Sequence, residues 1–395
     1  MIRSTLGSLT LLLAATAAQA QPSYEAVYFK GNRGFLLSDS GNVYRSLDAG
    51  ASWTGKKAKD SAYVTGIHFP SDKVGYMVGL GTILKTNDGG DTWTSPKKTG
   101  TWLSQVHFIT EDTGVAVGIG VIMRTTDGGT TWSTEVPHHP MGGVQTYSDV
   151  WFTGRDAGYL VGLDGWIRKS ADQGDTWDSL TSPTAHDLQA VHFPTPAVGY
   201  AVGDSGTIIK TSNAGASWAV QSSGTTKELH DVFFTDAQTG WAVGGGFTSA
   251  VILHTVNGGA TWAPQANPGT IYLSSVYFLD ANKGYAAGGF GNLLMTLDGG
   301  LHWGAITPSA IRGIEARAHG LRQEGGEVRY SLARPARVEM RLLDAGGRER
   351  AVLFSGVQPG GIHKLPLPAT GPAAGTYLLE FRADGLRETL PLSRP

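Results

Sequence analysis

The carboxylates and carboxamides of this sequence recur at a fixed distance from tryptophan. An Asp or Asn stands five residues before a Trp in seven segments, such as SLDAGASW and TNDGGDTW. Side chains of this type can act as general acids, hold a metal ion, or accept hydrogen bonds inside a turn. The acceptors are Asp48, Asp88, Asp127, Asp172, Asn213, Asn257 and Asp298, and their tryptophans are Trp53, Trp93, Trp132, Trp177, Trp218, Trp262 and Trp303.

The exchange of Asp for Asn separates these roles. Asn213 and Asn257 fill the position in two repeats. A turn acceptor tolerates this exchange, whereas a general acid or base requires a carboxylate. The Gly two residues later can adopt a positive φ, and the Trp can pack between sheets. We therefore interpret the seven segments as hairpin turns and expect no catalytic residue.

Histidine is the second candidate for chemistry. His68, His107 and His192 occupy the middle position of a Val-x-Phe-like segment. We expect equivalent positions to lie in different repeats, separated around an axis, whereas a metal ion needs ligands that converge on one point. The prediction is therefore ring packing, with no metal site and no cofactor. The same position carries other rings in the remaining repeats, at Tyr28, Trp151, Phe233 and Tyr277.

Basic residues follow the tryptophans of the first three repeats. Lys56, Lys57 and Lys59 follow the first, Lys97 and Lys98 the second, and the pair His138–His139 lies between two prolines after the third. We expect these residues in loops on one face, either as a solvated surface or as a docking patch for an acidic protein. The patch is small and lacks matching aromatic residues, so we expect no binding of nucleic acid.

The repeats define the elements that carry these residues. Each unit of roughly 40 residues contains four short segments rich in β-branched and aromatic residues, separated by turn signals. This is the pattern of a propeller blade. We predict an all-β chain with a seven-bladed β-propeller over residues 21–309. Each repeat supplies its own fourth strand, so we expect closure by packing between sheets rather than by a borrowed strand.

The two ends of the chain differ from the repeats. Residues 1–20 have a basic start, an apolar run and the segment Ala18-Gln19-Ala20, which predicts a cleaved signal peptide and no remaining transmembrane segment. We expect an exported protein that is periplasmic, secreted or on the cell surface. Residues 310–395 contain mainly Arg among their basic residues and several short β-like runs, which predicts a small β-sandwich.

The composition excludes several classes of protein. The chain of 395 residues contains 56 Gly, 11 Trp and no Cys. Without Cys there is no disulfide framework, thiol nucleophile or zinc–thiolate site. The formal charge of −2 gives no global attraction to nucleic acid. A hydrophobic fraction of 41% is sufficient for a folded core.

The Asp-x-Gly-x-Thr-Trp segments resemble the Asp box of the neuraminidase-type repeat superfamily. Over residues 24–303 the repeated F…G-aromatic-x-V-G…K-T-x-D-G-G-x-T-W unit is similar to the photosystem II stability/assembly factor family. That resemblance implies a non-enzymatic scaffold for a membrane-protein assembly intermediate or an envelope component. The tail resembles the sorting module of type IX secretion and the flagellar hook-capping immunoglobulin-like domain, which implies sorting, anchoring or adhesion.

The function predicted from the sequence is an exported scaffold for protein–protein interaction. The alternative is a glycan-binding or glycan-hydrolysing propeller of the sialidase superfamily. Hydrolysis would need two carboxylates roughly 5–10 Å apart, and the first to inspect are Asp164 and Asp204, each between the second and third segments of its repeat. The early Arg-Ile-Pro segment usual in sialidases is not in the sequence.

Overall fold

The fold is described from a computed structural model. It covers residues 22–57, 63–137, 144–269, 271–306, 322–324, 327–332, 336–343, 349–358, 361–367, 375–383 and 386–394. The predicted signal peptide and the predicted contact residues Lys59, His138 and His139 lie outside these ranges. No helix among the described residues is both long and apolar enough to cross a bilayer.

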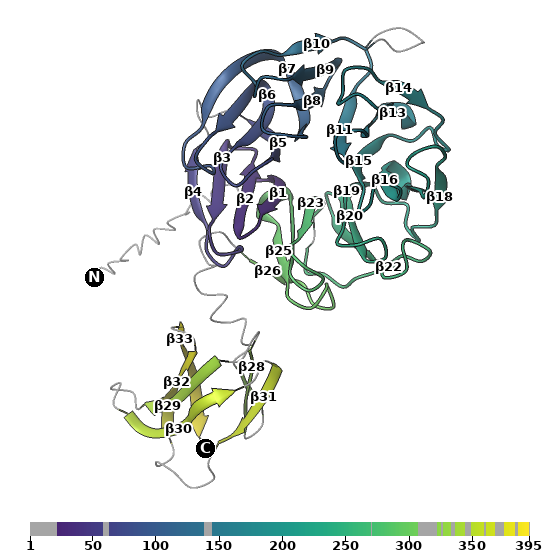
Figure 1. The fold of residues 1–395 in the computed structure, drawn as a ribbon. Helices are drawn as coiled ribbons and strands as arrows, with labels where there is room; N and C mark the ends of the chain where they lie inside the picture. Colours follow the sequence, from purple (N-terminus) through teal and green to yellow (C-terminus); the bar gives the residue numbers. More distant parts are fainter. Residues whose placement is uncertain are drawn as a thin grey trace, which may run out of the picture.

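Antiparallel sheets follow one another around an axis within residues 22–306 (Figure 1). Five of these sheets have four strands each, and in every one the first strand along the chain lies innermost. They are β1 (Tyr24–Lys30), β2 (Arg33–Ser38), β3 (Asn42–Ser46) and β4 (Thr54–Lys57); β11 (Tyr147–Phe152), β12 (Gly158–Gly162), β13 (Ile167–Ser170) and β14 (Asp178–Leu180); β15 (Leu188–His192), β16 (Gly199–Gly203), β17 (Ile208–Thr211) and β18 (Ala219–Gln221); β19 (Leu229–Phe234), β20 (Gly240–Gly246), β21 (Ser249–Thr255) and β22 (Ala263–Pro264); and β23 (Leu273–Phe278), β24 (Gly284–Gly288), β25 (Leu293–Thr296) and β26 (Gly304–Ala305).

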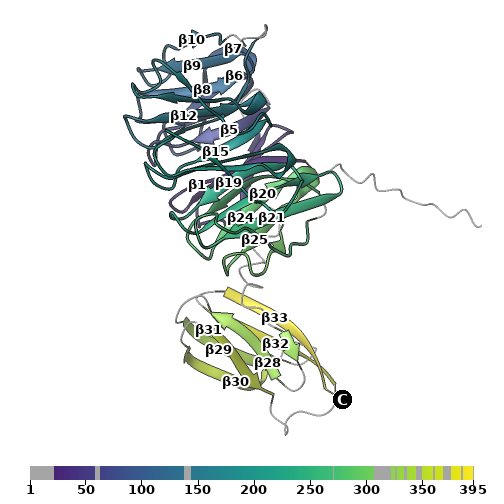
Figure 2. The same ribbon diagram turned by 90° about the vertical axis from the view of Figure 1, so that its right-hand side faces the viewer.

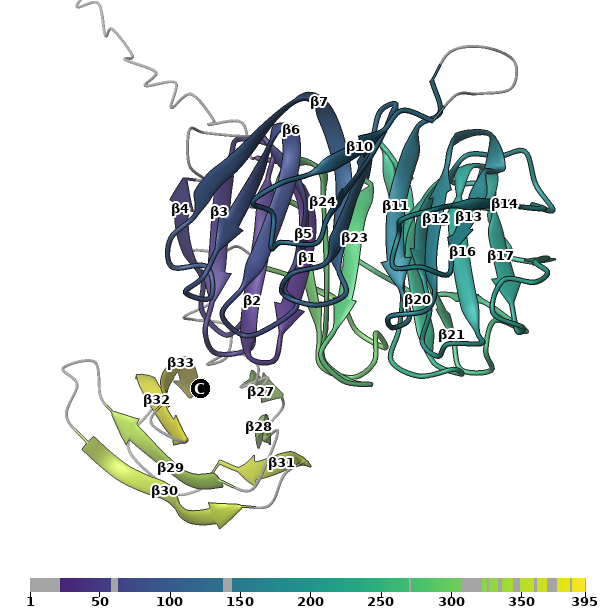
Figure 3. The same cartoon turned by 45° about the horizontal axis from the view of Figure 1, so that its top comes forward.

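The sixth sheet of this part spans two sequence repeats. It contains β5 (Val64–His68), β6 (Gly75–Thr86), β7 (Thr94–Phe108), β8 (Gly114–Gly118), β9 (Val121–Thr125) and β10 (Ser133–Glu135). Figure 3 shows β6 and β7 as long strands. β6 joins the second and third segments of one repeat, and β7 joins its fourth segment to the first of the next. The predicted all-β fold class is confirmed, and the described residues between 22 and 306 form six sheets, of which one carries two repeats.

The core lies between successive repeats. Seven clusters of buried side chains each combine residues of two neighbouring repeats. The cluster that joins the last repeat to the first contains Phe29 and Trp53 together with Tyr285 and Leu293. The first and last sheets share no strand. Burial of side chains between sheets therefore closes the ring, as the sequence predicts.

Each Asp or Asn of the Trp repeats organises the turn between the third and fourth segments. In the second repeat, Asp88 accepts the Thr92 N–H at 2.9 Å and the Thr92 hydroxyl at 2.6 Å. Asn213 makes the same contacts with Ser217, but its amide donates to the hydroxyl, at 2.9 Å. The Gly two residues after the acceptor has a positive φ, for example +85° at Gly90. Asn therefore serves the turn as Asp does.

The residue directly after this acceptor turns its carbonyl toward the preceding repeat. The Tyr76 hydroxyl and the Lys85 ammonium both donate to the Gly128 carbonyl, at 2.9 and 2.8 Å. Tyr159 with Lys169 and Tyr200 with Lys210 bind the carbonyls of Ala214 and Gly258 in the same way. At the closure of the ring, the Tyr285 hydroxyl donates to the Ala49 carbonyl at 3.0 Å. We call each of these contacts a turn latch.

The C-terminal residues form two further sheets (Figure 2). One contains β27 (Arg322–Glu324), β28 (Glu327–Leu332) and β31 (Gly361–Pro366), and the other β29 (Ala336–Leu343), β30 (Glu349–Gln358), β32 (Gly375–Ala383) and β33 (Leu386–Arg394). Tyr330 of the first sheet is buried in one cluster with Met340 and Phe381 of the second. The two sheets share a core, while the immunoglobulin-like topology and role of the tail stay predictions.

Substitution of Asp88 tests the role of the turn acceptor. We expect Asp88→Asn to change the free energy of unfolding little and Asp88→Ala to lower it by about 1 kcal/mol, because only Ala removes the acceptor. The bonds from the Thr92 hydroxyl and N–H lower the pKa of Asp88 to about 2. The native state therefore binds this proton less tightly than the unfolded chain, and the advantage of Asp over Ala should disappear as the pH falls from 5 to 2. Urea unfolding of the three proteins measures this, and equal losses for Asn and Ala would contradict it.

Substitution of Tyr285 tests the latch that closes the ring. Tyr285→Phe leaves the Ala49 carbonyl without this donor, and we expect a loss of about 1–2 kcal/mol in the free energy of unfolding. Tyr44→Phe is the control, since Tyr44 packs on the same cluster and its hydroxyl forms no hydrogen bond among the described residues. Equal stabilities of the two variants in urea unfolding would show that the latch contributes nothing.

Candidate functional site: the axial channel and one face of the ring

Seven aromatic rings, one from each innermost segment, form a closed belt around the axis. Their centroids lie 4.1–6.0 Å apart from one repeat to the next. The closest pair is His68 and His107, and the last contact returns from Tyr277 to Tyr28 at 5.6 Å. In order, the belt consists of Tyr28, His68, His107, Trp151, His192, Phe233 and Tyr277.

The belt corrects one expectation about the histidines. Equivalent positions are not separated around the axis: because the first segments are innermost, neighbouring rings touch. The predicted ring packing does describe these contacts. Burial lowers the pKa of His107 and of His192 to about 3 and also lowers that of His68, so all three rings are neutral near pH 7. Among the described residues, no three His, Asp or Glu side chains are placed to hold a metal ion.

A polar layer lies next to the belt, toward the start of each innermost strand. A register shift interrupts every one of these strands two or three residues before the belt position, as at Tyr147/Asp149. The Asp149 carboxylate accepts the N–H groups of Val150 and, from the next repeat, Val191, at 2.7 and 2.8 Å. Asp231 accepts those of Val232 and Val276 in the same arrangement, both at 2.8 Å. The two carboxylates thus connect neighbouring repeats.

Both carboxylates line a cavity of about 280 Å³ on the axis, which we call the axial channel. Part of each side chain remains exposed. Burial, together with repulsion from Asp231, raises the pKa of Asp149 to about 7. Burial raises the pKa of Asp231 to about 6, against the opposing effect of its backbone hydrogen bonds. Near neutral pH the channel therefore holds carboxylates whose charge is poorly stabilised by the protein.

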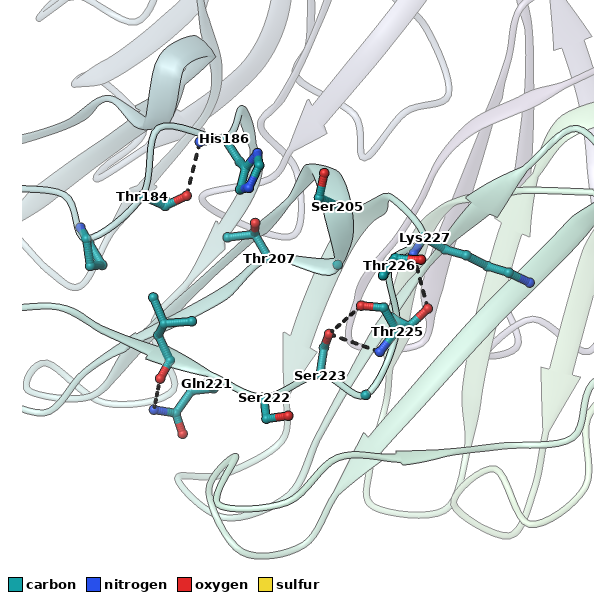
Figure 4. Close-up of a pocket in the computed structure, with 14 residues that line it drawn as sticks. Thr184, His186, Ser205, Thr207, Gln221, Ser222, Ser223, Thr225, Thr226 and Lys227 are labelled. Atoms are coloured by element: carbon teal, nitrogen blue, oxygen red, sulfur yellow. Dashed lines mark hydrogen bonds between the residues drawn. The ribbon is translucent and has the colours of Figure 1, made fainter.

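A second and larger cavity of about 830 Å³, which we call the groove, lies outside the channel, between the loops that lead into β15 and β19 (Figure 4). The two loops have the same local structure: Thr184 Oγ1 accepts the His186 N–H at 3.0 Å, and Thr225 Oγ1 accepts the Lys227 N–H at 3.1 Å. His186 and Lys227 are both exposed. Seven of the fourteen residues that line this groove carry hydroxyls, among them Ser205, Thr207, Ser222, Ser223 and Thr226.

The structure places four of the predicted contact lysines on strands rather than in loops. Lys56 and Lys57 end β4 and pair with Val43 and Asn42. Lys97 and Lys98 lie inside β7, and both are exposed. The loop prediction was wrong for Lys56 and Lys57 because β4 extends to Lys57, and for Lys97 and Lys98 because β7 continues from its outer position into the next innermost segment. Their role in binding stays a prediction.

The two carboxylates considered for hydrolysis lie in turns between the second and third strands of their sheets. Asp164 and Asp204 belong to the short 3-10 turns Leu163–Gly165 (η2) and Asp204–Gly206 (η3); the equivalent turn of the last repeat is Gly289–Gly291 (η4). The Asp164 N–H donates to the Asp187 carboxylate at 2.7 Å, and the Asp204 carboxylate accepts from Gln189 at 3.1 Å. These contacts fix the turns and the loop that precedes β15.

Sequence reasoning missed Asp149 and Asp231. The signal that could have found them is their repeat position, directly before the Val of Val-x-Phe. The other repeats carry Ala, Gly, Gln or Ser there, at Ala26, Gly66, Gln105, Ala190 and Ser275. A carboxylate beside the axis at a position that otherwise takes small or neutral residues calls for a partner or a ligand.

A family model described as photosynthesis system II assembly factor YCF48 matches residues 177–263 and 216–310, which is less than half of the chain. No curated protein sequence matches the chain. Among solved structures, YCF48 from Cyanidioschyzon merolae is 18% identical, with a TM-score of 0.58, over 70% of this chain and 96% of that one. The predicted resemblance of the ring to photosystem II assembly factors is confirmed, while that of the tail to sorting modules stays a prediction.

Two further structures show the same propeller fold. YCF48 bound to D1 peptide is 20% identical, with a TM-score of 0.53, over 79% of this chain and 95% of that one. The GH74 enzyme of Niastella koreensis is 14% identical, with a TM-score of 0.61, over 94% of this chain and 72% of that one. At these identities the likeness establishes the fold, and function must be argued from the site.

The raised pKa of Asp149 predicts an unusual dependence of stability on pH. The native state binds this proton more tightly than the unfolded chain, whose Asp titrates near pH 4. The contribution of Asp149 is therefore fully present below about pH 4 and is lost as the pH rises through about 7. We expect the difference in unfolding free energy between the wild type and Asp149→Asn to fall between pH 5 and pH 8. Because the wild type and Asp149→Asn share the buried histidines, the contribution of these histidines to the pH dependence cancels in the difference.

Urea unfolding at the two pH values measures this difference. Asp280→Asn is the control, because Asp280 accepts hydrogen bonds from Asn282 and Lys283 in an exposed turn away from the channel. A difference between the wild type and Asp149→Asn that stays constant or rises with pH would contradict the prediction.

Proposed function

We propose that this protein is a non-enzymatic propeller that binds a protein partner and acts as an assembly scaffold. The observation that carries the proposal is the match of the last repeats to the YCF48 model, together with the YCF48-like fold of the ring. The solved YCF48 bound to D1 peptide supports a peptide or protein segment as the ligand. A membrane-protein assembly intermediate or another envelope component is the partner class that this likeness favours.

The surface proposed for the partner is the face on which each repeat leads into the next. The groove between the loops before β15 and β19 lies on this face, and it offers many hydroxyls with His186 and Lys227 on its borders. Such a surface can hydrogen-bond an extended peptide and attract its carboxylates. The exposed Lys97 and Lys98 extend the positive charge onto the outer strand of an earlier repeat.

The proposed place of action is outside the cytoplasm. The sequence of residues 1–20 and the tail supports export to the periplasm, the cell surface or the medium. Fractionation of cells that express the full chain tests this part by itself. N-terminal sequencing should find Gln21 as the first residue of the mature protein. Retention of the intact chain in the cytoplasm would contradict export.

A partner-capture experiment tests the binding face. We expect the wild-type chain to capture a defined set of proteins from the native envelope fraction. Charge reversal in Lys97→Glu/Lys98→Glu, or obstruction of the groove in Ser222→Trp, should reduce this capture at least tenfold. Lys73→Glu is the matched control, because Lys73 is exposed in the turn between the first and second segments, at the opposite ends of the strands. Equal capture by all of these proteins would contradict the proposed face.

The alternative function is glycan binding or hydrolysis. The fold of the GH74 enzyme gives this alternative a structural precedent. Release of reducing sugar from plant and microbial polysaccharides by the full chain, abolished in Asp164→Asn or Asp204→Asn, would replace the scaffold proposal. Retention on a glycan array without hydrolysis would indicate a carbohydrate-binding module instead.

A further inference from the structure

We propose that the axial channel binds a small organic ammonium ion, with Asp149 and Asp231 as its counter-charges and the aromatic belt as its floor. This inference does not depend on the proposed function, because the channel and the groove are separate hollows with different lining residues.

The carboxylates of the channel have no salt-bridge partner among the described residues. Asp149 and Asp231 line the same cavity, and the ion pairs of the described residues include neither of them. Each carboxylate oxygen accepts one backbone N–H, and the Ser275 side chain also hydrogen-bonds Asp231, which still leaves lone pairs on both carboxylates for a further donor. Charged groups inside proteins are usually paired, and a cation between the two carboxylates would supply the missing charge.

His192 lies in the repeat between the repeat of Asp149 and the repeat of Asp231. Its side chain is 6% exposed and lines the channel, and its Nδ1 has no hydrogen-bond partner. An unpartnered nitrogen at this depth is costly unless a ligand or water reaches it. Because burial keeps the imidazole neutral, His192 adds a polar ring to the lining of the channel without repelling a cation.

Aromatic side chains of the belt line the channel. Tyr28, Trp151, Phe233 and Tyr277 line the cavity beside the two carboxylates. The faces of such rings attract cations, and organic ammonium groups are bound in this way in aromatic cages. A cation in the channel therefore meets carboxylates on one side and aromatic rings on the other.

Size and geometry decide between an organic cation and a metal ion. A volume of about 280 Å³ corresponds to roughly nine water molecules at about 30 Å³ each, so it can hold a ligand of several non-hydrogen atoms. A metal ion needs several ligand atoms at one point, and no three His, Asp or Glu side chains of the described residues are so placed. A primary ammonium with a short alkyl chain can span the separate contacts instead.

The test compares n-butylammonium with 1-butanol, which has the same number of non-hydrogen atoms and no charge. Both are titrated into the full chain at pH 8 by isothermal calorimetry. We expect the ammonium ion to bind at least tenfold more tightly than the alcohol. At pH 5, where Asp149 and Asp231, the latter close to His230, take up protons, we expect this preference to shrink at least threefold. Equal affinity for the two probes at pH 8 would overturn the proposal.

Variants locate the ligand in the channel. We expect Asp231→Asn to weaken n-butylammonium at least tenfold, whereas Asp280→Asn, which removes the same charge from an exposed turn, leaves the affinity unchanged. Because Asp231→Asn also disturbs two backbone hydrogen bonds, His192→Phe provides a second test. It keeps a ring in the belt, as Phe233 does, and should weaken binding about threefold or more. Affinities of folded Asp231→Asn and His192→Phe equal to that of the wild type would place the ligand elsewhere and overturn the proposal.

Discussion

In six of the seven repeats, the residue after the turn acceptor presents its carbonyl to a donor side chain of the preceding repeat, and the ring depends on these contacts. The Asp or Asn of a turn accepts the N–H and hydroxyl four residues later, and this bonding holds the intervening residue with a positive φ, even where it is Ala49, Gln173 or Ala214. Such a backbone is costly for a residue with a Cβ, so the turn must be fixed by its own hydrogen bonds before it can serve a neighbour. Once fixed, its carbonyl accepts hydrogen bonds from the preceding repeat, and at three junctions of the described residues the donors are a Tyr hydroxyl and a Lys ammonium together.

The latches act at the outer part of the sheets, whereas the channel connects the repeats at the axis. Here the register shift of each innermost strand frees backbone N–H groups, because a bulge leaves ladder positions unpaired. Asp149 and Asp231 satisfy such groups across two junctions, and the Ser275 hydroxyl accepts the Val27 N–H at 3.2 Å across the closure of the ring. Side-chain acceptors at the axis and carbonyl acceptors at the periphery thus give each repeat a defined angle to the next. Hydrophobic burial fills the space between them.

The sequence predicted the parts of this arrangement that repeat. The Asp or Asn, the positive-φ Gly and the Trp are local, and their spacing alone indicates a hairpin turn. What it could not show is that Tyr76 and Lys85, nine residues apart, reach the same carbonyl of another repeat. That convergence requires the strand pairing and the angle between repeats, which are properties of the ring. The continuous strand β7 was missed for a similar reason: Gly100 indicates a break, but β-pairing carries the strand through it.

Positions that depart from the repeat are where function must be sought, because the repeating ones are occupied by the architecture. The basic residues of the third segments illustrate this: Arg124, Lys169 and Lys210 form a ladder, yet each donates to a turn carbonyl of the next repeat and is not available to a substrate. Asp149 and Asp231 differ, since their position accepts Ala or Gly in other repeats without loss of the ring. Their hydrogen bonds to the next repeat need only an acceptor, so the negative charge that the two side chains gain as the pH rises through about 6 to 7 is not required by the architecture and lowers the stability of the ring. That cost is explained if the channel binds a cation.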